Sequence, residues 1–118
     1  MGEVLSARLE RGALHWRTRM GRKTAVRYLD TLAVALRPQG WRFIKLYRPV
    51  PVPLLRVYAN GAEDVGIVVS VLATPGGTWG YHEASRGRRG YLAPCGDAKS
   101  AGEVVGDLLK HRMYPATW

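Results

Sequence analysis

The sequence predicts an α+β domain of two layers, in which two N-terminal helices, an antiparallel meander of four to five strands and one C-terminal helix follow one another. Apolar residues recur at helical spacing in the first third of the chain and again near its end. Between these segments the period changes to two, starting at Trp41. Tight-turn signals join the strand-like segments, which favours antiparallel pairing of consecutive strands.

Length and composition allow one domain of this kind. The chain has 118 residues, of which 47% are apolar and 23% charged, and this balance is typical of a globular protein. A single Cys excludes a disulfide framework and a Cys-rich zinc site. Residues 1–20 carry six charged side chains and do not resemble a secretory signal. We therefore expect a cytoplasmic protein that holds no metal or cofactor and does not enter a membrane.

The first segment, residues 3–20, predicts a helix with two stripes. At 100° per residue the centres of the stripes lie about 120° apart. The apolar stripe consists of Leu5, Leu9, Ala13, Trp16 and Met20. The basic stripe consists of Arg8, Arg11, His15, Arg19 and Arg22. Because Gly21 is a natural break, we divide the chain into a basic amphipathic helix, residues 1–21, and a single α+β domain, residues 22–118.

A second helix is predicted at about residues 24–36, with Thr24 as its cap and Pro38-Gln39-Gly40 as its stop. The last helix follows Asp97, which can cap it, or a capping box of Ser100 and Glu103; Pro115 ends it. Its apolar face consists of Ala101, Val104, Val105, Leu108, Leu109 and Met113. Helices gathered at both ends of the chain are expected to cover one face of the sheet.

Strands are predicted at residues 41–47, 54–59, 66–73, 78–83 and 91–93. Asn60-Gly61 and Pro75-Gly76-Gly77 supply tight turns, and Pro49, Pro51 and Pro53 predict an extended connector. Residues 85–90 form a basic, glycine-rich loop. We expect the second sheet face to be open and to offer aromatic rings for stacking. The candidates are Trp41, Phe43, Tyr58, Trp79 and Tyr81.

The positive charge is concentrated in the N-terminal part. Residues 1–48 hold eleven Lys and Arg against three acids, a net charge of +8, whereas residues 49–118 have a net charge of +1. Such asymmetry indicates an anionic partner for the N-terminal part.

Signals for catalysis are weak. Cys95 precedes the last helix, where a thiol can have a lowered pKa, but no base is placed beside it by the sequence. His82 shows no metal-ligand spacing, and the glycine-rich stretches match neither a P-loop nor GxGxxG. We therefore expect a protein that is not an enzyme, with a Cys95-based activity as the open alternative.

The order of elements from Thr24 to Met113 is similar to that of double-stranded-RNA-binding domains. Those domains have three strands and a cluster of lysines at the start of the last helix, where this chain has Lys99 beside Asp97. No residue is given a role from this similarity.

The leading hypothesis is a small accessory or regulatory module that binds an anionic partner, above all nucleic acid. The basic stripe would contact phosphates together with Arg86, Arg88 and Arg89 of the basic loop. The alternative is a protein-binding adaptor or a homodimer, which would use the sheet face and Leu5, Leu9, Trp16 and Met20 of the apolar stripe. In that case the basic stripe would face an acidic surface of the partner protein.

Overall fold

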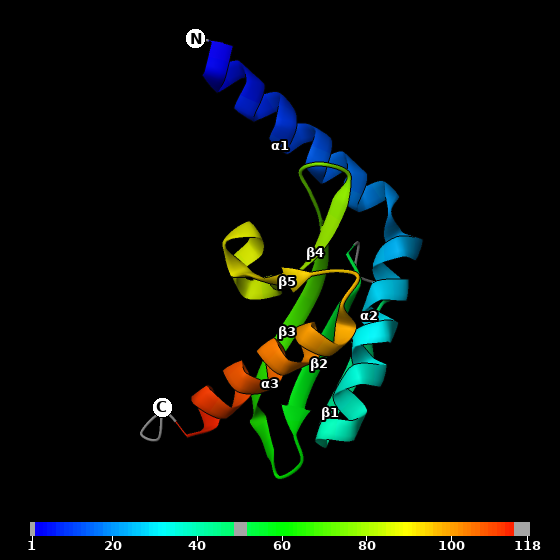
Figure 1. Cartoon of the computed structure of the whole chain (residues 1–118), viewed down its shortest axis with the longest axis vertical. Helices are drawn as coiled ribbons and strands as arrows, with labels where there is room; N and C mark the ends of the chain where they lie inside the picture. The colour runs from blue at the N-terminus through cyan, green and yellow to red at the C-terminus, as the bar shows by residue number, and fades with distance from the viewer. Residues whose placement is uncertain (1, 49–51, 115–118) are drawn as a thin grey trace.

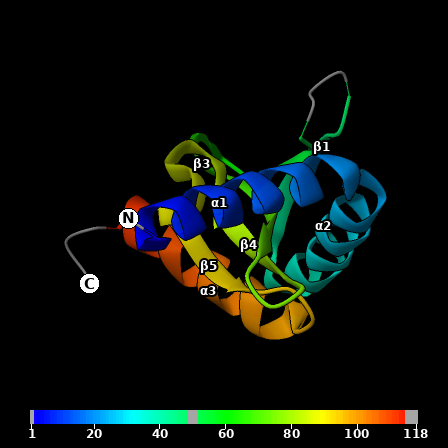
Figure 2. The ribbon, with the colours of Figure 1, turned by 90° about the horizontal axis from the view of Figure 1, so that it is seen from above.

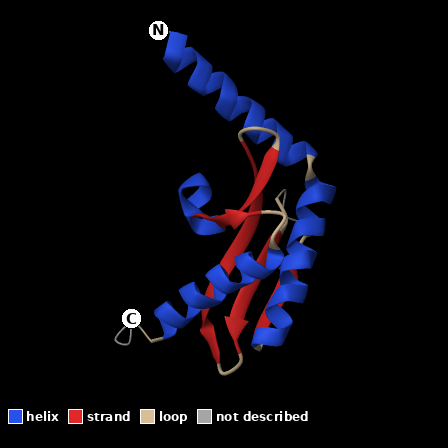
Figure 3. Ribbon diagram, in the orientation of Figure 1, coloured by secondary structure: helices blue, strands red, loops and turns tan. Residues whose placement is uncertain are grey.

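The computed structural model describes the backbone of residues 2–48 and 52–114, and the side chains of residues 11–48 and 52–114. Figures 1 and 3 show the elements. In chain order they are α1 (Gly2–Met20), α2 (Arg22–Leu36), the 3₁₀ turn η1 (Arg37–Gln39), β1 (Trp41–Leu46), β2 (Leu54–Ala59), β3 (Ala62–Thr74), β4 (Thr78–Glu83), the 3₁₀ segment η2 (Ala84–Gly90), β5 (Tyr91–Pro94) and α3 (Ala98–Met113). The predicted α+β class is confirmed.

The sheet is an antiparallel meander of five strands in the order β1-β2-β3-β4-β5. β3 lies at its centre and, at 13 residues, is the longest strand in the described chain. Gly61 and Gly76 adopt positive φ in the two predicted turns, which glycine tolerates without steric cost. With five strands, the sheet also differs from that of double-stranded-RNA-binding domains, which has three.

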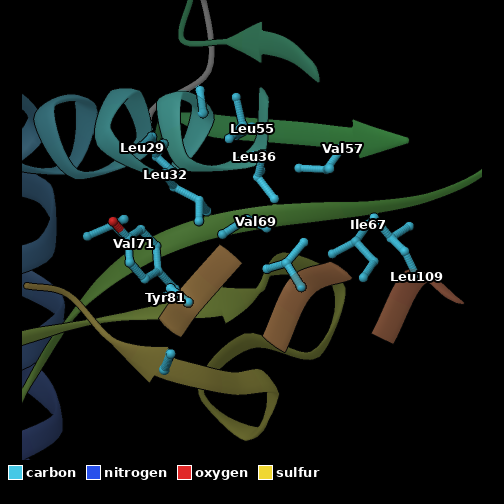
Figure 4. Packing of buried hydrophobic residues seen from close by; sticks show 14 of the residues in the cluster. Leu29, Leu32, Leu36, Leu55, Val57, Ile67, Val69, Val71, Tyr81 and Leu109 are labelled. Atoms are coloured by element: carbon cyan, nitrogen blue, oxygen red, sulfur yellow. The ribbon is translucent and has the colours of Figure 1, made fainter. Parts of the chain in front are cut away.

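α2 and α3 pack on one face of the sheet and bury a single core. Figure 4 shows Leu29, Leu32 and Leu36 of α2 facing Val69 of β3, with Leu109 of α3 beside Ile67. Asp97 caps α3 by accepting a hydrogen bond from the backbone N–H of Ser100 at 3.1 Å, as one of the two sequence alternatives predicts. Pro49 and Pro51 of the predicted connector and Pro115 at the predicted end of the last helix lie outside the described residues.

The structure corrects the expected beginning of the second helix. α2 begins at Arg22, and Thr24 lies inside it and caps nothing. The Gly21 N–H donates to the Arg17 carbonyl, and the Gly21 carbonyl accepts from the Ala25 N–H, each at 2.9 Å. These two hydrogen bonds join α1 to α2 at Gly21, but its φ of −93° and ψ of 31° are not helical. The first helix therefore ends at Met20 and the second begins at Arg22, with a bend between them.

The expectation of an open aromatic face is wrong for four of the five candidate rings. Tyr81 belongs to the core, and Trp41, Phe43 and Trp79 pack against it. Only Tyr58 lies on the opposite face, where it pairs with Arg42. The helix-covered face needs the largest side chains to fill its volume, and alternation along the strands cannot tell which face that is.

Gly21 is required by the close approach of Trp79. A Cβ atom at this position would overlap the indole ring. We therefore expect Gly21→Ala to lower the free energy of unfolding by about 1–3 kcal/mol, because the ring must shift from a well-packed position. Urea unfolding measures the change.

Gly12→Ala is the matched control, since Gly12 also lies in α1 and open space surrounds its Cα. It should raise stability by about 0.5–1 kcal/mol through helix propensity alone. Equal effects of the two substitutions would contradict the packing role of Gly21.

Candidate nucleic-acid interface

α1 is attached to the sheet by polar contacts at the end of the β3–β4 hairpin. The Thr18 hydroxyl accepts a hydrogen bond from the backbone N–H of Ala73 at 2.9 Å and donates to the Leu14 carbonyl at 2.8 Å. The Arg17 guanidinium donates to the carbonyls of Thr74 and Thr78 at 3.0 and 3.2 Å. It also lies 5.5 Å from the centre of the Trp79 ring. One face of α1 is thereby fixed.

This attachment divides α1 into three faces. The fixed face contains Leu14 and Thr18, which are buried, together with Arg17 and Gly21. By helical geometry the basic stripe lies about 110° to one side of it and the apolar stripe about 130° to the other. Both predicted stripes therefore point away from the sheet. In Figures 1 and 2, α1 crosses the end of the sheet and its N-terminal part extends beyond it.

The described members of the basic stripe are accessible, with one exception. Arg11, His15 and Arg19 are exposed. Arg22 is half-buried and donates to the Tyr47 carbonyl, which connects it to the segment after β1. Arg8 lies in α1, but its side chain is outside the described residues, as are those of Leu5 and Leu9.

The described members of the apolar stripe are also accessible. Trp16 is 64% exposed and Met20 is 68% exposed. Ala13 is exposed as well. Such large apolar side chains on one helix face mark a surface that differs from the solvated remainder of the molecule.

The basic loop is a folded segment, η2. Arg86 and Arg89 are exposed, while the Arg88 guanidinium donates to the Ala73 carbonyl at 2.7 Å. Gly90 is buried at the base of η2, where a Cβ atom would lie 2.6 Å from the Glu83 carbonyl oxygen. Among the three arginines predicted to contact an anion, Arg88 thus has a structural contact that the sequence did not predict.

α1 and η2 meet at Ala73. This residue lies beyond the end of β2, whose pairing with β3 stops at Leu54 and Ser70. The backbone N–H of Ala73 donates to the Thr18 hydroxyl, and the Arg88 guanidinium donates to the Ala73 carbonyl. On α1, Arg11 lies within about 20° of Thr18 around the helix axis. The structure therefore brings the two predicted basic segments to the same edge of β3.

Two acids near this surface, Asp30 and Glu83, have internal partners. The Asp30 carboxylate lies 2.8 Å from the Lys45 ammonium and accepts from the Tyr47 hydroxyl, and the Lys45 contact lowers the pKa of Asp30. Glu83, buried beside η2, pairs with Arg112 at 2.6 Å. No Asp or Glu occurs between residues 11 and 29, a segment with six Lys and Arg, or within η2. The formal charge of these two segments is therefore positive.

His82 lies beneath η2 and is buried. Its ring is in edge contact with Tyr91, with 5.4 Å between ring centres, and its Nδ1–H donates to the Gly80 carbonyl at 2.9 Å. Burial lowers the pKa of His82, and the Arg88 cation lowers it further. His82 is therefore neutral in the folded protein at neutral pH, which suits a core residue.

The described residues offer little for catalysis. Burial raises the pKa of the Cys95 thiol to about 12, which disfavours the thiolate that a nucleophile needs. Within residues 11–48 and 52–114, whose side chains are described, no three His, Cys, Asp or Glu side chains are grouped so that they could hold a metal ion. None of the described helices is long and apolar enough to cross a bilayer.

The sequence analysis missed Lys23 and Arg27, two exposed cations on α2. They follow the bend at Gly21 and extend the cationic segment of residues 11–29. The signal was the charge of this segment, which contains six Lys and Arg and no acid.

Comparison of the chain with protein-family models, with curated proteins and with solved structures gives no match.

Arg88→Ala should lower the free energy of unfolding by about 1–2 kcal/mol, because the Ala73 carbonyl loses its charged donor. Arg89→Ala, which removes an exposed arginine from the same segment, should change it by less than about 0.5 kcal/mol. Chemical denaturation of both variants makes the comparison. Equal stabilities would contradict the structural role of Arg88.

Stability should fall as the pH drops below about 6.5, the ordinary pKa of histidine. In that range the unfolded chain binds a proton at residue 82 while the folded protein, with a lower pKa there, does not, so unfolding is favoured. His82→Gln should lose less stability between pH 7 and pH 5. The exposed His15 provides the control His15→Gln, which should keep the wild-type pH dependence in thermal unfolding.

Proposed function

We propose that this protein is a non-enzymatic module that binds nucleic acid through the phosphate backbone, using the basic stripe of α1 together with η2. The observation that carries the proposal is the meeting of these two cationic segments at Ala73. Residues 11–29 and η2 contain no Asp or Glu, and the neighbouring acids Asp30 and Glu83 pair with Lys45 and Arg112, so the cationic charges add at one edge of the sheet. Release of counterions would supply much of the affinity.

The dimensions of the basic stripe suit a phosphate backbone. Residues 11 to 22 span about 16 Å along a helix, which corresponds to roughly five phosphates at 3.4 Å of rise per nucleotide in one strand. Arg86 and Arg89 lie on the other side of the Thr18–Ala73–Arg88 contact and can reach further phosphates. Arg11, His15 and Arg19 of the stripe are exposed, whereas Arg22 also contacts the Tyr47 carbonyl.

The structure favours backbone contact over base stacking. Four of the five aromatic rings that could have stacked on bases lie on the helix-covered sheet face. Binding through phosphates carries little sequence information. We therefore expect affinity for duplexes of unrelated sequence to be similar.

Fluorescence anisotropy with random duplex DNA, duplex RNA and single-stranded DNA, from about 50 to 300 mM salt, tests the proposal. Four phosphate contacts predict a log–log slope of affinity against salt of about −3 to −4. The double variants Arg11→Ala/Arg19→Ala and Arg86→Ala/Arg89→Ala should each weaken binding and make the slope shallower by about 1–2, since each removes up to two contacts.

Lys99→Ala/Lys110→Ala is the matched control, because it removes two exposed cations from α3. It lowers the net charge equally and should leave the slope unchanged. Absence of binding at the lowest salt, or the same loss in the control as in the α1 variant, would overturn the proposal.

A further inference from the structure

An apolar surface runs along the outer side of α1 and α2, apart from the basic stripe. We define the outer helical surface by Trp16, Met20, Lys23, Val26, Arg27 and Val34. Val34 is 67% exposed, comparable with Trp16 and Met20. Trp16 and Met20 lie one turn apart at the end of α1, and the hydrogen bonds of Gly21 join this end to the start of α2. On α2, Lys23, Arg27 and Val34 lie within about 40° of one another around the helix axis.

This surface is hollowed over α2. One shallow hollow of about 460 Å³ is lined by Lys23, Val26, Arg27, Asp30, Thr31 and Val34. A second, of about 420 Å³, is lined by Arg22, Lys23, Val26, Tyr47 and Arg48. The two hollows share Lys23 and Val26 and so form one depression. From residue 16 to residue 34 the surface is about 27 Å long, which is the length of roughly five helical turns.

The charges around the surface are positive. Arg19, Lys23, Arg27 and Arg48 are exposed along its rim, and the acid in the depression, Asp30, is paired with Lys45. A second copy of the chain would bring like charges together at this rim. A phosphate backbone would complement the cations but would leave Trp16, Met20 and Val34 in water.

We propose that the outer helical surface binds an acidic amphipathic helix of another protein. Its apolar side would cover Trp16, Met20, Val26 and Val34, and its carboxylates would face the basic rim, as in helix-in-groove recognition. The basic stripe of α1 is centred about 120° from the apolar stripe. The two proposed surfaces therefore meet at Arg19 and Arg22. Because the variants used below leave both arginines intact, either proposal can fail without the other.

The probe is a labelled synthetic peptide of about 20 residues with leucines at helical spacing on one side and glutamates elsewhere. A second peptide carries lysines in place of the glutamates. Fluorescence anisotropy with the full chain should show binding of the glutamate peptide and none of the lysine peptide. Trp16→Ser/Met20→Ser should weaken binding at least tenfold, and Lys23→Glu/Arg27→Glu should weaken it as strongly.

Val104→Ser/Tyr91→Ser is the control, because it removes two exposed apolar side chains elsewhere and should leave binding unchanged. Circular dichroism checks that every variant is folded. Three results would overturn the proposal: equal binding of both peptides, binding that Trp16→Ser/Met20→Ser does not weaken, or a dimer in sedimentation equilibrium that this double variant dissociates. The last result would assign the surface to a second copy.

Discussion

The backbone of Ala73 is the point on which the arrangement of α1 and η2 depends. β3 runs past the end of β2, so the peptide groups of Ala73 have no strand beside them on that side. Buried backbone groups without partners are costly, and here two side chains, from Thr18 and Arg88, take the place of a strand. The edge of β3 at Ala73, which no strand covers, therefore determines where α1 and η2 lie.

The contacts at this edge explain why α1 keeps two free faces. A helix usually attaches to a sheet through an apolar stripe, which hides its most distinctive surface. α1 attaches instead through Thr18 and Arg17, which are polar, and through the space that Gly21 leaves for Trp79. Trp16 and Met20 of the apolar stripe and Arg11, His15 and Arg19 of the basic stripe therefore stay exposed in the folded chain.

The sequence predicts the fold well because the fold follows from local signals. Period-two alternation and the turns at Asn60-Gly61 and Pro75-Gly76-Gly77 identify the meander, and Asp97 identifies the beginning of α3. The attachment of α1 could not be predicted, because Thr18 and Arg17 carry no hydrophobic period. The three arginines of η2 likewise carry no hydrophobic period, so the sequence could not show that Arg88, unlike Arg86 and Arg89, has a structural contact. The sequence also could not predict which sheet face the helices cover, because period-two alternation defines two faces without showing which one is buried.

β1 forms an outer edge of the sheet, and its position has a consequence for association between molecules. An edge strand offers backbone groups that can pair with any extended chain, including another copy. Arg42 and Arg48 are exposed in and just after β1, so two such edges repel each other. This protection is electrostatic and weakens as salt screens the charges. Ionic strength would therefore act on this molecule in two opposing ways: it would weaken the proposed binding to polyanions, and it would lower the electrostatic barrier between sheet edges.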